Sequence, residues 1–194
     1  MGPSIDYVLV EAENPYSGVR ARYVLAKALV NSVFGDKIPF EIVADGIKGR
    51  DLVGIRYEQL IPWFRPDEGA FRVIPGDYVT TEDGTGIVHI APTFGADDMK
   101  VARAAGVPGL MVTDFNGDPQ AQVDPRGRFY RLEDLDPGYV AERVSPEYSE
   151  WAGRYVKNAY DPSLAPDAPT LDIDISVMLK ASNKAFRIEK HVHT

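Results

Sequence analysis

The stretch DGTGIVHIAPTFGADDMKVARAAG, residues 83–106, begins with a turn and an apolar segment. Gly84 and Gly86 allow a tight turn and leave room for another group to approach the backbone, because glycine has no side chain. The apolar run Ile87–Ala91 then predicts a buried or half-buried strand. This strand carries His89, one of only three histidines in the chain. The sequence therefore places a rare titratable side chain inside an expected strand.

The second half of the same stretch predicts a turn followed by a helix. Residues 92–95 (PTFG) carry turn signals, and the pattern from Asp97 onward predicts a helix that ends at Gly106. Asp97 and Asp98 then lie in the first helical turn, where carboxylates complement the helix dipole and the free N–H groups. Successive residues of a helix point about 100° apart, so both carboxylates cannot serve one cap equally well. Either both carboxylates act as capping groups, or one faces a cleft and binds an ammonium group through a charge-assisted hydrogen bond.

His89 also has two interpretations. A single histidine on a strand is commonly a packed or hydrogen-bonded residue without a chemical role. Alternatively, a strand end and the helix after its turn often meet at one edge of a fold, where ligand sites form. His89 and Asp98 could then line a single pocket, and on the residues alone both interpretations stay open.

We expect no metal ion in this domain. His89, Asp97 and Asp98 lack a recognisable ligand spacing, and His191 and His193 supply two ligands at most. A metal-dependent hydrolase built on the first three residues is therefore the least favoured alternative. The sequence also contains no nucleophile elbow, phosphate loop or dinucleotide-binding motif.

The composition indicates a globular chain without disulfides. Its 194 residues, 44% of them hydrophobic, suffice for one domain with a substantial core, and no apolar run reaches the length of about 18–20 residues that spans a bilayer. Cysteine is absent, which excludes thiolate catalysis and cysteine–zinc sites and fits a reducing compartment.

The net charge of −8 argues against a long contact with a nucleic-acid backbone, although a short single-stranded end could be bound. The best basic candidates for such a contact are Lys180, Lys184, Arg187 and Lys190. The alternative is that these side chains form a solvated charged face.

Several short strands and one helix are predicted before residue 83. Ile5–Val10 (IDYVLV) is rich in residues that favour strands. The helical spacing of apolar residues from Ala26 to Phe34 predicts a helix that Gly35 terminates. Further short strands, separated by Gly, Asp and Pro, are predicted at Phe40–Val43, Leu52–Tyr57 and Ala70–Ile74. Many short strands with turns between them suggest a barrel or a sandwich.

After residue 106 the sequence predicts a mixture of elements. Leu110–Val112 is a candidate strand before a strong turn at Asp114–Pro119, and Asp136 with Pro137 marks the start of a helix over residues 139–143. Thr170–Lys180 satisfies both strand alternation and helical spacing, so periodicity does not decide it. The alternating segment Ala185–His193 predicts a strand.

The segment GTGIVHIAPTFGADD, residues 84–98, resembles the signature of the editing domain inserted in isoleucyl-tRNA synthetase. Valyl and leucyl relatives share the GTG turn and a later aspartate, but they usually lack the histidine–proline–phenylalanine–glycine pattern at residues 89–95. Thr93 stands where alanine is commoner. The resemblance covers essentially the whole chain, through IDYVLV (5–10), KGRDLVGIRYEQL (48–60), YVTTEDGTG (78–86), GRYVKNA (153–159), LDIDISVMLK (171–180) and AFRIEKHVH (185–193).

The resemblance implies a fold and a function. The fold is mainly β with peripheral helices, a β-barrel of the isoleucyl/valyl/leucyl-tRNA synthetase editing-domain type, and residues 170–180 are then helical. The function is hydrolysis of mischarged valyl-tRNA(Ile), and of valyl-adenylate as a second candidate substrate, by a water positioned at the aminoacyl ester. An ester of this kind is already activated, so neither a nucleophilic side chain nor a metal or other cofactor is required.

Site residues follow from the resemblance position by position. The amino-group-binding aspartate of the family matches Asp98, and the histidine that lines the pocket matches His89. We prefer an orienting and size-selecting role for His89 over that of a general base. The remaining expected substrate-binding residues lie in the same motif and are Thr93, Phe94, Gly95 and Asp97.

The resemblance also implies partners and a context. We expect a monomeric, cytoplasmic domain, residues 1–194, that acts on the 3′ end of misacylated tRNA(Ile) within the rest of the synthetase, where ATP is bound. Family members carry a threonine-rich segment just upstream of the part that matches residues 3–7. The chain is therefore expected to be a fragment without that pocket wall, weakly active or inactive in isolation. The alternative is a non-catalytic module that binds an RNA end or a partner protein.

Overall fold

The structure of the chain is a computed structural model that describes residues 1–165, 168 and 170–189. The chain divides into two compact units. The first comprises Met1–Tyr57, Phe71–His89 and the described residues from Ser176 onward. The second comprises Glu58–Ala70 and the described part of Ile90–Ile175. Sheets and helices both occur in the described residues, which gives a mixed content, whereas a mainly β fold was predicted.

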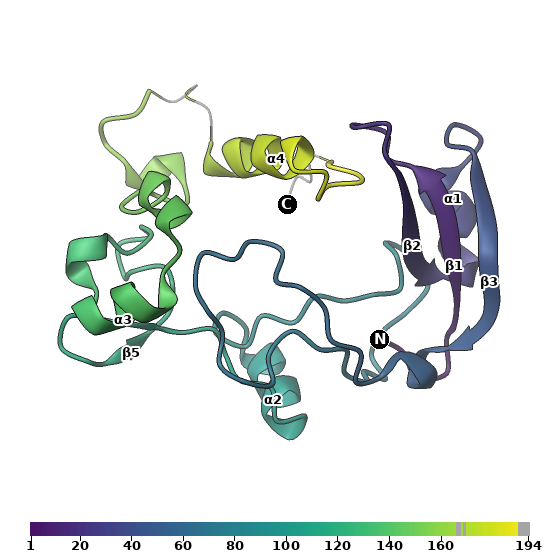
Figure 1. Ribbon diagram of the computed structural model, residues 1–194, viewed down its shortest axis with the longest axis horizontal. Coiled ribbons are helices and arrows are strands. Elements are labelled where there is room, and N and C mark those ends of the chain that lie inside the picture. Colours follow the sequence, from purple (N-terminus) through teal and green to yellow (C-terminus); the bar gives the residue numbers. More distant parts are fainter. Residues whose placement is uncertain (166–167, 169, 190–194) are drawn as a thin grey trace. The chain divides into compact units, whose positions relative to one another are not determined.

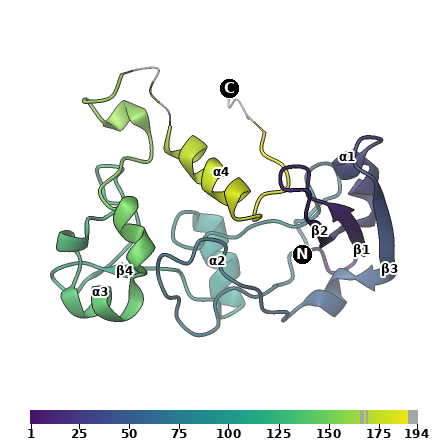
Figure 2. The same cartoon turned by 45° about the horizontal axis from the view of Figure 1, so that its top comes forward.

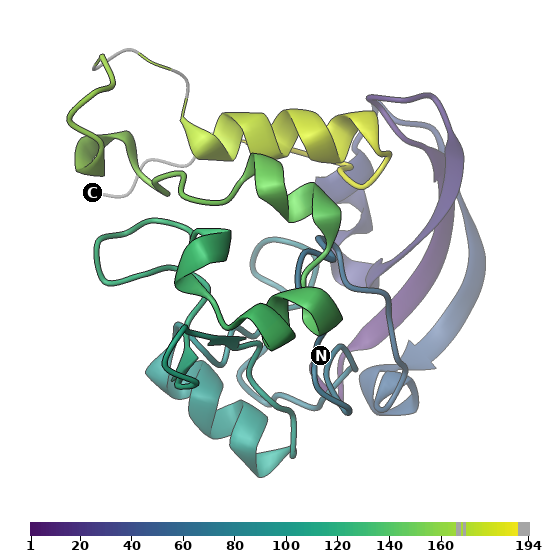
Figure 3. The same cartoon turned by 60° about the vertical axis from the view of Figure 1, so that its left-hand side comes forward.

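The first unit is built on a three-stranded antiparallel sheet in the order β2-β1-β3 (Figures 1 and 3). Its strands are β1 (Asp6–Glu13), β2 (Arg20–Ala26) and β3 (Phe40–Lys48). β1 is the central strand, and its buried side chains are Tyr7, Val8, Val10 and Ala12. Aromatic and β-branched residues suit this half-buried pleated surface. The strands predicted at Ile5–Val10 and Phe40–Val43 are confirmed.

A short helical segment packs on this sheet. It consists of the 3-10 turn η1 (Lys27–Leu29) and helix α1 (Val30–Phe34), which ends at Gly35. The core cluster between helix and sheet contains Val8, Val10, Ala12, Leu25, Val30 and Phe34. The predicted helix is thus confirmed from Lys27 onward. Ala26 differs, because it pairs with Tyr7 as the last residue of β2.

Two other predicted strands pair only irregularly. Leu52–Tyr57 and Ala70–Ile74 are joined by an isolated bridge and a few backbone hydrogen bonds, and neither forms a regular strand. Leu52 ends the 3-10 turn η2 (Gly49–Leu52). Phe71 has a φ of 51°, a left-handed conformation that a bulky side chain rarely adopts and that interrupts an extended ladder. The predictions of regular strands at both segments are therefore wrong, although the two segments pair irregularly with each other.

The strand predicted at Ala185–His193 is wrong for its described part, residues 185–189. Side chains of the first unit occupy the backbone groups that a neighbouring strand would bond. The side-chain amide of Asn14 donates to Ala185 O at 2.8 Å, and Ile188 N–H donates to the Tyr16 hydroxyl at 2.9 Å. The remainder of the segment lies outside the described residues.

The second unit combines helices, a short hairpin and an aromatic core. Its elements are α2 (Ala96–Ala104), β4 (Val112–Thr113), β5 (Pro119–Gln120), η3 (Leu132–Asp134), α3 (Pro137–Arg143), η4 (Pro146–Glu150) and η5 (Asn158–Tyr160), of which β4 and α3 are labelled in Figure 2. Ring contacts hold the core together. The Trp63 and Trp151 rings lie 5.0 Å apart between centroids, and the Phe64 and Tyr148 rings lie 4.5 Å apart.

Local signals in this unit are confirmed. Asp114–Pro119 forms the turn between β4 and β5. The Asp114 carboxylate accepts hydrogen bonds from two backbone N–H groups of the turn, each at 2.9 Å. The candidate strand Leu110–Val112 is present only from its last residue. At α3, the Asp136 carboxylate accepts from Tyr139 N–H at 2.7 Å, and Pro137 occupies the first helical position.

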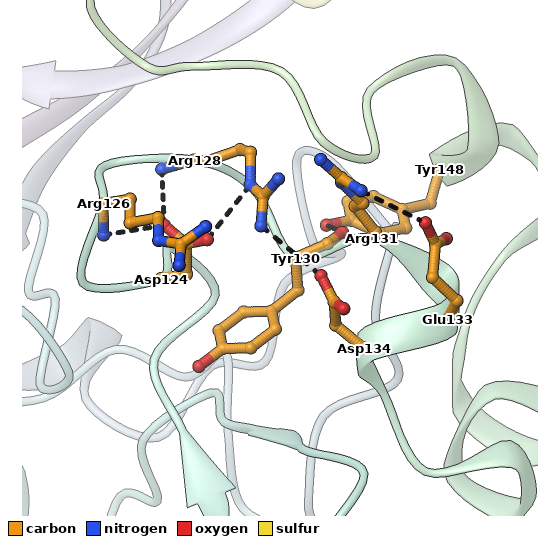
Figure 4. A network of polar contacts seen from close by, with 8 residues as sticks. All are labelled: Asp124, Arg126, Arg128, Tyr130, Arg131, Glu133, Asp134 and Tyr148. Carbon is orange, nitrogen blue, oxygen red and sulfur yellow. Dashed lines mark hydrogen bonds and ion pairs between the residues drawn. The ribbon is translucent and has the colours of Figure 1, made fainter. Parts of the chain in front are cut away.

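A buried polar network lies beside the hairpin (Figure 4). Arg128 is 8% exposed, and its Nε donates to Asp124 Oδ2 at 3.1 Å. The same guanidinium contacts Asp134 Oδ2 at 3.5 Å. The other Asp124 oxygen accepts from the backbone N–H groups of Arg126 and Arg128 at 2.9 and 3.0 Å. Because charge-assisted bonds fill both carboxylate oxygens, this pair fixes the loop from residue 124 to residue 128.

The ambiguous segment 170–180 is helical, as the family resemblance predicts: α4 is Leu171–Ala181. Asp172 and Asp174 lie in its first turn and Lys180 in its last, which complements the helix dipole at both ends. The helix is followed by Asn183 with a φ of 57°, a common way to terminate a helix. Across the described ranges, no helix is long and apolar enough to cross a bilayer.

Candidate functional site

The GTG turn at residues 84–86 is fixed to the sheet of the first unit. Ala26 N–H donates to Thr85 O at 2.9 Å, and the Tyr7 hydroxyl donates to Gly86 O at 2.6 Å. Both glycines have positive φ, 65° at Gly84 and 72° at Gly86. A Cβ added to Gly86 would also lie 2.5 Å from the Cβ of Ala26, closer than any real side chain allows. The turn therefore requires glycine at residue 86 for both backbone and packing reasons.

His89 follows this turn on an exposed segment, and the strand predicted at Ile87–Ala91 is wrong. Ile87 and Val88 are 41% and 47% exposed, and His89 is also exposed. The run has the apolar content of a strand, but none of its residues is paired in a sheet of the described structure. His89 is therefore not packed in a core, and its role in a ligand site stays a prediction.

The second half of the motif forms the predicted turn and helix. Phe94 and Gly95 N–H groups both donate to Ala91 O, at 3.0 and 3.2 Å, which closes the turn before α2. Gly95 occupies the N-cap position and offers no side-chain cap. Asp97 and Asp98 lie in the first turn of α2, as predicted.

The two adjacent carboxylates have different environments. Asp97 is 96% exposed at its side chain and contacts Lys100 Nζ at 3.4 Å. Asp98 is half-buried, and its Oδ2 accepts from Ala91 N–H at 2.9 Å. Within the part of the chain that the structure describes, no further donor bonds the Asp98 carboxylate. Asp98 is thus held by the loop before the helix rather than by the helix's own amides, and its second oxygen is left for another donor.

Gly95 determines how closely the loop approaches this carboxylate. A Cβ on Gly95 would lie 3.1 Å from both Cγ and Oδ2 of Asp98. Such a distance is tighter than ordinary packing, so a larger residue would displace the carboxylate. Residue 95 therefore needs glycine for close packing and not for its backbone conformation, because a φ of −122° is open to any residue.

The side chains of Thr93 and Phe94, in the turn before α2, have different environments. The Thr93 hydroxyl donates to Leu110 O at 3.2 Å and ties the turn to the segment before β4. This contact of Thr93 was not predictable from its replacement of the commoner alanine. Phe94 is 61% exposed, which leaves an aromatic face free at the turn.

His89 and Asp98 belong to different compact units, because the division falls between residues 89 and 90. The hypothesis that both side chains line one pocket therefore stays a prediction. Each half of the motif is nevertheless ordered by its own contacts. Sequence reasoning missed the buried Tyr7 hydroxyl that holds the GTG turn, although the tyrosine itself lies in the strand pattern IDYVLV.

The expected basic contact surface is only partly present in the described residues. Lys180 Nζ lies 4.4 Å from the centre of the Tyr16 ring, a cation–π contact. Arg187 forms an ion pair with Glu189, which neutralises its charge. Lys190 lies outside the described residues. Lys180 therefore contacts an aromatic ring and Arg187 is paired, and binding of an RNA end by this segment stays a prediction.

No group of three or more potential metal ligands occurs among residues 1–165, 168 and 170–189. His191 and His193 lie outside these ranges.

No protein-family model matches the chain. Curated relatives match along its whole length. The chain is 54% identical to isoleucine–tRNA ligase from Bacteroides fragilis, 49% identical to that from Porphyromonas gingivalis and 32% identical to that from Thermoplasma volcanium. It spans 18% of the length of the first two relatives and 14% of the third.

These matches show that the chain is homologous to a segment of an aminoacyl-tRNA synthetase. The chain belongs to the isoleucine–tRNA ligase family and matches part of the length of those relatives. The family resemblance of residues 84–98 is confirmed.

Proposed function

We propose that the chain is the editing domain of an isoleucine–tRNA ligase and hydrolyses the ester of valyl-tRNA(Ile), with valyl-adenylate as a second candidate substrate. The observation that carries this proposal is the Asp98 carboxylate, held at one oxygen by Ala91 N–H with its other oxygen left for a donor. The β-barrel of synthetase editing domains belongs to the same proposal, and the antiparallel sheet of the first unit supports it.

The need for such a domain follows from binding energetics. One methylene in an apolar pocket changes binding by only about 1–3 kcal/mol, and isoleucyl-tRNA synthetase is itself the well-known case of this limit. A second, smaller pocket that accepts the valyl product and rejects the isoleucyl product raises the overall selectivity. The proposed domain supplies this second pocket.

Asp98 has the chemistry required to bind the substrate's amino group. A valyl ester carries an ammonium group, which donates charge-assisted hydrogen bonds to a carboxylate. Because Ala91 N–H fixes Oδ2, the carboxylate is oriented before the substrate arrives, and less order is lost on binding. We propose that the remaining oxygen accepts from the ammonium group.

The hydrolytic step needs little from the protein beyond positioning. Water attacks the ester carbonyl carbon, the bond to the terminal ribose oxygen breaks, and that oxygen takes a proton, which releases valine and tRNA. Fixing the ammonium group places the carbonyl relative to the water. We propose that exposed His89 orients the substrate and limits its size, and that the 93–95 turn lines the pocket. Asp97, which faces solvent beside Lys100, is the less favoured of the two carboxylates for the ammonium group.

The test uses the full-length ligase that contains this chain. Asp98→Ala is expected to slow hydrolysis of valyl-tRNA(Ile) by about 10- to 100-fold, the loss expected for a hydrogen bond to a charged group, and to leave isoleucylation unchanged. Valyl-tRNA then accumulates. Asp172→Ala is the matched control, because it removes a first-turn carboxylate from a different helix.

Two outcomes contradict the proposal. Undiminished deacylation by Asp98→Ala removes this residue from the site. Saturable binding of valyl-tRNA by the wild-type ligase without release of valine favours the alternative, a module that binds the RNA end without catalysis.

A further inference from the structure

Tyr7, the second residue of β1, places a polar group inside the core of the first unit. Its side chain is fully buried, and Ala26 and Leu29 belong to the same core cluster. Burial raises the pKa of the Tyr7 phenol above its ordinary value, so the hydroxyl keeps its proton. A buried hydroxyl costs free energy unless it is hydrogen-bonded, and the Tyr7 hydroxyl acts as both a donor and an acceptor.

The two partners of this hydroxyl come from distant parts of the sequence. It donates to Gly86 O at 2.6 Å and accepts from Gly2 N–H at 3.0 Å. The bond to Gly86 joins residues 79 positions apart and ends at the last residue of the GTG turn. Tyr7 therefore connects the central strand of the sheet to the turn that precedes His89.

Other contacts hold the same turn against the sheet. Ala26 N–H donates to Thr85 O at 2.9 Å, and the missing side chain of Gly86 lets the turn lie against Ala26. The bond from Tyr7 and the contacts with Ala26 anchor the turn to β1 and β2. The turn is therefore a rigid point of the first unit.

The segment after the turn lacks comparable support in the described structure. Residues 87–89 are exposed and form no strand. Three residues extend the chain by at most about 10 Å, so His89 stays within that distance of the anchored turn.

We propose that Tyr7 is a positioning residue of the proposed hydrolytic site: its hydroxyl fixes the GTG turn and, through the turn, the exposed segment that presents His89. This inference rests on the proposed editing function. Tyr7 acts without touching the substrate. Its removal changes how the bound ester is oriented, whereas ammonium binding by Asp98 is unaffected.

The experiment compares two tyrosine-to-phenylalanine variants of the full-length ligase. Tyr7→Phe removes the hydroxyl that bonds the turn. Tyr148→Phe is the matched control, because Tyr148 is also fully buried and its hydroxyl also donates to a backbone carbonyl, Tyr130 O, at 2.6 Å. Tyr7→Phe loses two hydrogen bonds, to Gly86 O and from Gly2 N–H, and Tyr148→Phe loses the one to Tyr130 O. Thermal unfolding measures the loss of stability in each variant.

Hydrolysis of valyl-tRNA(Ile) separates positioning from stability. Tyr7→Phe is expected to lower kcat about tenfold, the factor for the lost hydrogen bond to the turn, with KM within about twofold of wild type. Tyr148→Phe is expected to keep both constants within about twofold of wild type. Equal kinetics for the two variants overturn the positioning role and leave the editing function standing. A wild-type ligase that does not hydrolyse valyl-tRNA overturns the editing function itself.

A second pair of variants applies if Tyr7→Phe does not fold. Gly84 and Gly86 share positive φ, but a Cβ on Gly84 meets nothing within 4 Å, whereas one on Gly86 lies 2.5 Å from Ala26. Backbone strain is therefore common to Gly84→Ala and Gly86→Ala, and displacement from the sheet is specific to the second. A greater loss of kcat in Gly86→Ala supports the proposal, and equal losses overturn it.

Discussion

The Asp98 carboxylate accepts a hydrogen bond from the backbone N–H of Ala91 at 2.9 Å. This bond ties the first turn of α2 to the start of the loop that leads into it, so the carboxylate cannot rotate freely about its side-chain torsions. Asp97, one residue earlier, has no such restraint from the loop and faces solvent. The side chains of the two neighbouring aspartates thus differ in how firmly they are held, because only that of Asp98 is bonded to the preceding loop.

Gly95→Ala tests whether the orientation of Asp98 matters. The new Cβ would lie 3.1 Å from Oδ2, so the carboxylate must shift by a few tenths of an ångström. We expect KM for valyl-tRNA(Ile) to rise about 2- to 10-fold, as for a weakened hydrogen bond, with a smaller change in kcat. Steady-state deacylation by the full-length ligase measures both constants.

Gly138→Ala is the control for this substitution. Its Cβ would lie 3.2 Å from Oδ1 of Asp136, which is also a carboxylate oxygen that accepts a backbone hydrogen bond but lies outside the proposed site. A KM for Gly95→Ala no higher than that of Gly138→Ala would show that the Asp98 contact is not used in binding.

Arg128→Met tests the buried ion pair of the second unit. The side chains of Arg128 and Asp124 are 10% and 9% exposed, so removing the guanidinium leaves a carboxylate that is nearly out of water. Removing one partner of a buried pair costs about 3–5 kcal/mol, and the two backbone donors that remain on Asp124 favour the lower value. Urea denaturation measures the loss in free energy of unfolding. Arg20→Ala, which breaks an exposed pair with Glu11, should cost much less, and an equal cost would contradict the burial argument.

Asp114 should make the stability of the hairpin depend on pH. Its pKa lies below the ordinary value of 3.8, chiefly because the carboxylate accepts a hydrogen bond from Asp118 N–H and also from the Gln120 side chain. For a carboxyl with a lowered pKa, the stabilisation is complete above the unfolded-state pKa and is lost as the pH falls through the folded-state value. We expect Asp114→Asn to lose stability relative to wild type at about pH 5 and to approach wild type at about pH 2.5. Urea midpoints at the two pH values measure this difference, and a constant difference would count against the assignment.

The predictable elements of the fold are those with local signals. β1, α1 and α3 follow from residue preferences, apolar spacing and an Asp–Pro start, and each is present near its expected position. The failed strand at Ile87–Ala91 has the same kind of apolar content. A strand also needs a partner, however, and pairing is decided by residues far away in the sequence. Composition alone could not reveal that lack of a partner.

The candidate site was predictable to a similar degree. The sequence placed Asp97 and Asp98 in a first helical turn, and geometry implied that they would face differently. It could not say which one would be restrained, because the donor is a backbone N–H of Ala91 and every residue except proline has one. The bond from Tyr7 to Gly86 was equally hidden, since it spans 79 positions.

The contact between Ala26 and Gly86 also limits how this family can vary. With a methyl group at residue 26, no side chain fits at residue 86, and a larger group at residue 26 would push the whole turn outward. Homologous sequences should therefore keep small residues at both positions together. A larger residue at one of them should be tolerated only in homologues that also lack the proposed deacylation activity.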